Sequence, residues 1–276
     1  MDATTLVEAA LLGVLDGFTE FLPVSSAAHV AVAAGFLGLS GERLRTLECA
    51  LQLGSVLAAI GVCARRSGLA SLRSERRADT RRMAASVSIA VLPVLLLGLL
   101  ARRALQGYFV NGSMMATLLF AGGAFMLLAE ARYRVAPRVQ TLRELSEMDA
   151  LKIGLFQCVG VALVGIGRPD ACVVTGLLLG LSRRTALQFS ILLAIPTILL
   201  ACSTGLANGY DLLAADDLAP VFVGSACAFG CAWASLEWML RFVSEESYVP
   251  FAWYRFGGGF VLLATLISGV VKWSDG

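Results

Sequence analysis

The chain has 276 residues, of which 58% are hydrophobic and 15% are charged, and its mean hydropathy is +0.78. An average soluble domain carries about 25% charged residues, so this composition excludes an ordinary soluble protein and indicates an all-α integral membrane protein. The net charge is only +2, which does not point to nucleic acid as a partner.

The first apolar stretch, residues 5–39, is interrupted by Pro, Gly, Ser and charged side chains. A second stretch, residues 150–181, is broken in the same way. Six others approach or exceed the roughly 20 apolar residues with which a helix crosses a bilayer. In chain order these are residues 47–64, 83–101, 113–131, 186–206, 218–240 and 251–272. The sequence therefore predicts about six transmembrane helices and two irregular segments that are not simple spans.

The arginines are concentrated in two loops. Seven of them lie between Arg65 and Arg82, and four lie between Arg132 and Arg143. By the positive-inside rule, both loops are expected in the cytoplasm and the acidic loop at 207–217 on the opposite side. Because topology already explains the clusters, the lipid bilayer is the expected partner and nucleic acid is not.

The two broken segments resemble each other. "GVLDGFTEFLPVSSAAH" from Gly13 and "GLFQCVGVALVGIGRPD" from Gly154 both lead to a similar close, "FLGLS" and "LLGLS". This predicts one polytopic membrane domain, 1–276, with repeat halves 1–131 and 150–276 joined by a basic cytoplasmic loop, 132–149. Broken helices at matching places in two halves indicate a site near the middle of the membrane. The alternative is that Gly and Pro merely kink ordinary spanning helices.

Two carboxylates in the first half are candidates for a cation site. Asp16 and Glu20 are four residues apart, so both lie on one face of a helix. Neighbouring acids in a low dielectric need a cation or a proton, and hard oxygen ligands suit Mg²⁺ or Ca²⁺. The simpler alternative is a solvated helix end.

A hydroxyl and imidazole cluster follows. Pro23 ends the helix, and Ser25 and Ser26 then either cap the next helix or contact a substrate. His29 is the one histidine of the chain and is predicted to serve as nucleophile or general acid or base together with Ser26. The alternative is that His29 is a structural core residue.

The second half contributes an arginine. Arg168 lies in an apolar segment, where a permanent charge is costly and by default functional, and its planar fork suits phosphate. Asp170 is an alternative structural partner for it. Gln157 stands in the second half where Asp16 stands in the first and is predicted to contact the substrate. Together these residues favour phosphate-ester or pyrophosphate chemistry on a lipid.

The first motif resembles the signature E-G-x-T-E-F-L-P-V-S-S-T-G-H of the undecaprenyl-pyrophosphate phosphatases, the bacitracin-resistance family. The region 153–196 is similar to that family's second motif and the segments after it, and "LQLGSVLA" and "PFAWYRFGGG" are similar to further family segments. The resemblance implies six spanning helices, two re-entrant helical hairpins and an inverted repeat in the bacterial inner membrane. It also implies hydrolysis of undecaprenyl diphosphate with a divalent cation.

The resemblance assigns Asp16 and Glu20 to the acidic pair, Ser26 and His29 to the catalytic positions, and Arg168 to the diphosphate. The chain departs from the family where serines flank the arginine, because Gly167 and Pro169 flank Arg168 here, and Asp170 follows them. Two alternatives therefore stay open, a polyprenyl-phosphate transporter or flippase and a binder of lipid diphosphates without catalysis. The oligomeric state is also open, and a homodimer is one alternative.

Overall fold

The computed structural model describes residues 3–39, 41–67, 74–105, 112–133, 136–162, 167–209 and 218–269. These described residues form ten α-helices and one 3-10 helix, η1 (Leu142–Glu144). Within them no strand is found, and a single parallel bridge joins Val139 to Leu181. The expected all-α class is confirmed.

Among the described residues, six helices are long and apolar enough to cross a membrane, as the sequence predicts. Their apolar spans lie within a few residues of the expected ones; the second, for example, is Thr80–Leu97. The helices are α3 (Gly41–Ser67), α4 (Ser74–Leu105), α5 (Gly112–Ala131), α8 (Arg183–Gly209), α9 (Leu218–Glu245) and α10 (Val249–Ser268).

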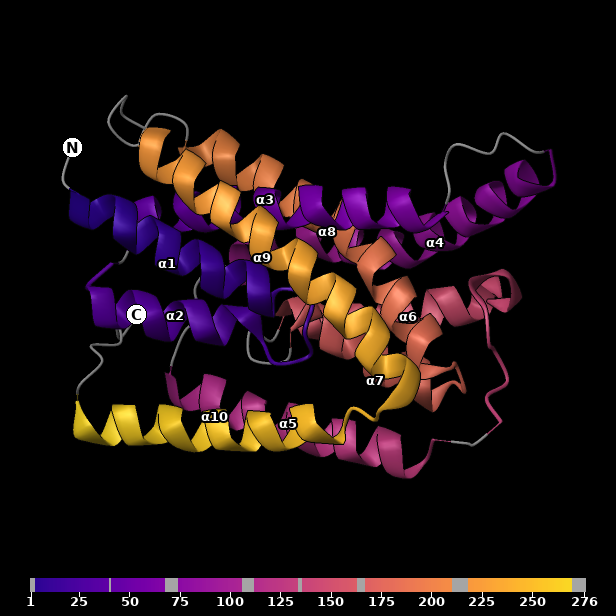
Figure 1. The fold of residues 1–276 in the computed structure, drawn as a ribbon. Helices are drawn as coiled ribbons and strands as arrows, with labels where there is room; N and C mark the ends of the chain where they lie inside the picture. Colours follow the sequence, from indigo (N-terminus) through magenta and orange to yellow (C-terminus); the bar gives the residue numbers. More distant parts are fainter. Residues whose placement is uncertain are drawn as a thin grey trace.

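The two broken segments form pairs of shorter helices. α1 (Ala3–Thr19) is followed by α2 (Ser26–Leu37), and α6 (Glu147–Ala162) is followed by α7 (Arg168–Leu178). At about 1.5 Å per residue, α2 and α7 are too short to cross a bilayer core of about 30 Å. α1 and α2 lie at the end of the bundle that carries the N-terminus, and α6 and α7 lie toward the opposite end (Figure 1).

Local chemistry explains where the helices of the first pair break. Pro23 disfavours helical geometry at Leu22, and α1 ends at Thr19, shortly before it. α2 ends at Leu37, and the next residue, Gly38, adopts the left-handed conformation and donates its N–H to the carbonyl of Gly35 at 3.3 Å. The chain between α1 and α2 is therefore a bend within the bundle.

Small residues let α1 approach the long helix α9 closely. Gly13 and Gly17 face the backbone of Gly224 and Ala228, and a Cβ atom at either glycine would collide with it. Such close contact between small residues is a common way for helices to associate in membranes. Gly154 of α6 lies in the same way against the backbone of Ala90 on α4.

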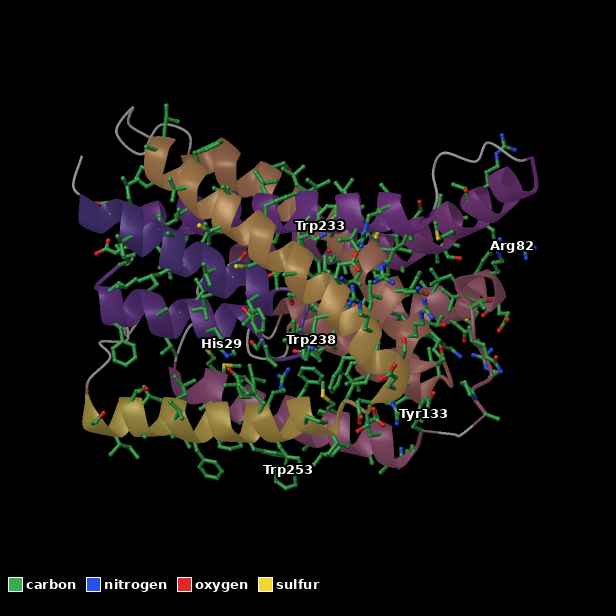
Figure 2. The ribbon with its side chains drawn as sticks, viewed as in Figure 1. His29, Arg82, Tyr133, Trp233, Trp238 and Trp253 are labelled. Atoms are coloured by element: carbon green, nitrogen blue, oxygen red, sulfur yellow. The ribbon has the colours of Figure 1, made fainter. Side chains whose placement is uncertain are left out.

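Arg82 and Tyr133, from the two basic segments, lie toward the same end of the bundle (Figure 2). By the positive-inside rule we expect this end to be cytoplasmic, and that orientation stays a prediction. The central part of the acidic loop, 210–217, lies outside the described residues. The division into halves 1–131 and 150–276 stays a prediction, although the order of two short helices followed by three long ones occurs twice.

Candidate active site

A polar cavity of about 190 Å³ lies where the bends of the two hairpins meet. The sequence predicts four of the residues that line it as site residues: Glu20, Ser25 and Ser26 from the first half and Arg168 from the second. The other lining residues are Leu22, Ala27, Gln52, Gly160, Gly167 and Pro169. Residues about 150 positions apart in sequence therefore share one cavity.

An ion pair joins the two helix pairs, α1–α2 and α6–α7, across this cavity. The Nη2 atom of Arg168 lies 3.2 Å from Oε1 of Glu20. The Glu20 side chain is 5% exposed, whereas that of Arg168 is 19% exposed, so the guanidinium remains open to the cavity. Arg168 occupies the first turn of α7, directly after Gly167, whose φ of 62° turns the chain.

Asp16 is buried one helical turn before Glu20. Its Oδ1 accepts a hydrogen bond of 3.3 Å from the hydroxyl of Ser26, and its Oδ2 accepts one of 3.0 Å from Ser55 of α3. Asp16 is therefore placed to orient the Ser26 hydroxyl and to accept its proton.

Ser25 is the one non-glycine residue with positive φ in the described part of the chain, at 68°. It is the residue before α2, but its side chain makes no capping hydrogen bond. Its carbonyl oxygen instead lies 2.8 Å from Nδ1 of His29. Left-handed geometry at a non-glycine residue is costly and often occurs at functional sites.

His29 extends from α2 toward α10 (Figure 2). Because the Ser25 carbonyl can only accept, Nδ1 of His29 donates to it, and in the neutral ring Nε2 accepts from the hydroxyl of Tyr254 at 2.7 Å. The two rings stack with their centroids 5.6 Å apart. His29 lines a neighbouring apolar cavity and is not among the residues that line the polar one.

Sequence reasoning missed the partner of Asp170. Arg255 of α10 is fully buried, and its guanidinium forms an ion pair with the Asp170 carboxylate. The alternative that Asp170 is the counter-ion of Arg168 is therefore wrong, because Arg168 pairs with Glu20. The signal was present, since an arginine inside an apolar span needs a partner, but the sequence does not say which acid lies opposite.

The structure does not bring Gln157, the last of the predicted site residues, to the polar cavity. Gln157 is 1% exposed, does not line the polar cavity, and its Oε1 has no hydrogen-bond partner in the described part of the protein. Residues 163–166 of the second motif lie outside the described residues. No group of three or more acidic, His or Cys side chains suited to a metal is found among the described residues.

The chain matches known proteins over its whole length. The family model of the bacitracin resistance protein BacA matches residues 9–261. The undecaprenyl-diphosphatase of Acidovorax ebreus is 39% identical, with 100% of both chains covered, as is that of Verminephrobacter eiseniae. Undecaprenyl-diphosphatase 1 of Paraburkholderia xenovorans is 37% identical over the full length of both chains. The chain therefore belongs to the BacA bacitracin-resistance family.

Proposed function

We propose that this protein hydrolyses undecaprenyl diphosphate to undecaprenyl phosphate and inorganic phosphate in the bacterial inner membrane. The reaction returns the carrier lipid to cell-wall synthesis. Relatives that match along the full chain carry the name undecaprenyl-diphosphatase. The observation that carries the proposal is the cavity in which Arg168, Glu20 and the hydroxyl of Ser26 meet.

Arg168 is proposed to bind the diphosphate. A guanidinium presents several donors in a plane and matches phosphate oxygens two at a time. Its ion pair with Glu20 keeps the side chain in place before the substrate arrives, so little conformational entropy is lost on binding.

Ser26 is proposed as the nucleophile. Its oxygen attacks the terminal phosphorus while its proton passes to Asp16, which already accepts a hydrogen bond from it. The bond from that phosphorus to the bridging oxygen breaks, and undecaprenyl phosphate leaves. Water then cleaves the phosphoserine and releases inorganic phosphate. Ser55 holds the second oxygen of Asp16, which fixes the orientation of the carboxylate.

His29 is proposed to act mainly on the backbone of Ser25. Its Nδ1 holds the Ser25 carbonyl, while its Nε2 is occupied by Tyr254. This arrangement maintains the left-handed bend that points the next residue, Ser26, into the cavity. The sequence predicts that His29 also transfers a proton. For this, the hydrogen bond between its Nε2 and the Tyr254 hydroxyl would have to break first.

A divalent cation fits the donor set at Glu20. Mg²⁺ commonly binds through one or two carboxylates together with substrate phosphates and water, so a group of three protein ligands is not required. Glu20 and Gln52 line the cavity and are the ligands we propose, although the Gln52 oxygen also accepts a hydrogen bond of 3.8 Å from the Cys202 thiol. When bound, the cation would neutralise part of the charge of the diphosphate. The sequence also predicts Asp16 as a cation ligand. Both of its oxygens already accept hydrogen bonds, so a cation would have to compete with these bonds.

The experiment that tests this function measures phosphate released from undecaprenyl diphosphate by the purified protein in detergent. Parallel reactions contain Mg²⁺, Ca²⁺ or a chelator. We expect release that depends on a divalent cation and that is lost in Glu20→Ala. A folded protein that binds the lipid and releases no phosphate under any of these conditions would contradict hydrolysis and favour a carrier or binder.

A further inference from the structure

A separate cavity of about 410 Å³ lies between α3 and α8. α3 contributes Ile60, Cys63 and Arg66 to its wall, and α8 contributes Gln188 and Ile195. α4, η1 and α9 add one lining residue each. The cavity shares no lining residue with the polar cavity, and its volume suits a small-molecule ligand, for which about 300–1,000 Å³ is usual. We call it the α3–α8 cavity.

The α3–α8 cavity runs from the end of a spanning helix into the apolar part of the bundle. The Cys202 thiol lies 3.2 Å from the Cys49 carbonyl oxygen at one end of these two helices. Arg66 and Gln188 line the cavity toward the other end, so α3 and α8 are antiparallel. Arg66 is the last residue of the apolar span of α3, and Ile60 lies about 9 Å deeper along the axis. One end of the cavity therefore lies at the depth of lipid headgroups and the other among acyl chains.

The wall of the cavity suits a hydrocarbon chain. Among its described lining residues, Arg66, Gln188 and Cys63 are the ones that carry a side-chain hydrogen-bond donor. A polar ligand that lay deep in the cavity would lose hydrogen bonds to water, whereas an acyl chain loses none. Arg66 is the one charged side chain in this lining, so the polar part of a ligand is expected beside it.

The mouth of the cavity carries an excess of positive charge. Arg65 and Arg66 both form ion pairs with the same carboxylate, that of Glu237 on α9. Nη2 of Arg66 lies 2.6 Å from Oε2 of Glu237, and its side chain is 32% exposed. Two guanidinium groups against one carboxylate leave one positive charge uncompensated within this trio. A phosphate group can compensate it, because a guanidinium has enough donors for both anions.

Two other segments bring arginines to the same mouth. Met83 of α4 lines the cavity and directly follows Arg82. Leu142 of η1 lines the cavity and directly precedes Arg143. Both of these arginines are exposed. Basic pockets between spanning helices and arginines next to a span both attract anionic lipid headgroups.

We propose that the α3–α8 cavity binds an anionic phospholipid, with one acyl chain along its apolar wall and the phosphate group beside Arg66. The apolar wall selects the chain, and the excess positive charge at the mouth selects an anionic headgroup over a zwitterionic one. This site goes beyond the proposed hydrolysis, because the polar cavity takes no part in it.

The test measures binding to the purified full chain by native mass spectrometry, with no substrate present. The ligands are dioleoylphosphatidylglycerol, dioleoylphosphatidylcholine and glycerol phosphate, which has an anionic head without chains. We expect phosphatidylglycerol to bind about tenfold more tightly than phosphatidylcholine, and an excess of glycerol phosphate to leave it bound. Equal affinity for the two lipids, or displacement of phosphatidylglycerol by glycerol phosphate, would overturn the proposal.

Two variants locate the bound lipid. Arg66→Gln should raise the Kd of phosphatidylglycerol about fivefold, whereas Lys152→Gln, which removes an exposed charge on α6, should leave it unchanged. Ala64→Phe adds a ring to the cavity wall and should raise the Kd of both lipids about tenfold. Ala124→Phe, at an exposed position of α5, is its control. An unchanged Kd for phosphatidylglycerol in Arg66→Gln or in Ala64→Phe would overturn the site, whether or not the protein hydrolyses undecaprenyl diphosphate.

Discussion

Arg168 and Glu20, one from each hairpin, form an ion pair of 3.2 Å at the wall of the polar cavity. Because the pair links α7 to the bend after α1, it fixes the position of one side of the site relative to the other. Neither hairpin forms this site alone.

The first prediction concerns the geometry of the Arg168 side chain. Arg168→Lys keeps the charge but loses the planar fork, so we expect kcat/KM to fall about 10²-fold. Arg138→Lys is the matched control, because the Arg138 side chain is 55% exposed and pairs with Asp149 away from the cavity. Steady-state phosphate release measures both, and equal activity of Arg168→Lys and the wild type would contradict the proposed role.

The second prediction concerns the buried pair of Asp170 and Arg255. Asp170→Asn leaves the fully buried guanidinium without its counter-ion, and we expect a loss of about 3–5 kcal/mol in the free energy of unfolding. The double variant Asp170→Asn with Arg255→Gln should recover part of this loss, because it removes the unpaired charge. Chemical unfolding in detergent measures these two variants and Arg255→Gln alone. A double variant whose loss equals the sum of the two single losses would show that the two side chains do not interact.

The third prediction concerns the backbone of Ser25. Glycine adopts positive φ without strain, whereas a β-branched residue is strongly disfavoured there. We expect Ser25→Gly to retain the stability of the wild type and Ser25→Val to lose about 1–3 kcal/mol. A higher KM in Ser25→Gly would reveal the predicted contact of the hydroxyl with substrate. Equal stability of the two variants would show that the bend does not require a left-handed residue.

The fourth prediction concerns pH and the start of α6. Burial opposes ionisation of Asp149, but hydrogen bonds from Ser146 and Arg138 outweigh it and lower the pKa of Asp149 below its ordinary value of 3.8. The ionised form is favoured in the folded protein, so its contribution to stability is present above the unfolded pKa and is lost as pH falls through the folded one.

Unfolding in detergent between about pH 6 and about pH 3 measures this effect. We expect stability to fall with pH more steeply in the wild type than in Asp149→Asn, while the exposed control Glu147→Gln follows the wild type. Identical slopes for the wild type and Asp149→Asn would contradict the assignment.

Hydropathy predicts the spanning helices well because a bilayer imposes a minimum apolar length. The breaks near Pro23 and Gly167 follow from local backbone chemistry and are also readable from the sequence. The meeting of Glu20 with Arg168 was expected from the similarity of the two broken segments, since matching bends of two halves tend to meet.

Other features depend on which helices lie opposite each other, and this arrangement cannot be predicted from the sequence patterns. Arg255 reaches Asp170 because its side chain extends from α10 past Gly122 of α5, where a Cβ atom would collide with the guanidinium. His29 faces Tyr254, although its position near Ser26 suggested a place inside the polar cavity. The left-handed Ser25 was also unpredictable, because serine rarely adopts that conformation.

The most direct test of the central claim measures phosphate release from undecaprenyl diphosphate, with Mg²⁺, by the wild type and by Ser26→Ala. Ser190→Ala is the control, because Ser190 is also a helical serine and its hydroxyl donates to the carbonyl of Leu187 in its own helix. We predict that Ser26→Ala lowers kcat by about 10³-fold or more while lipid binding is retained, and that Ser190→Ala is unaffected. Full activity of Ser26→Ala would contradict the account.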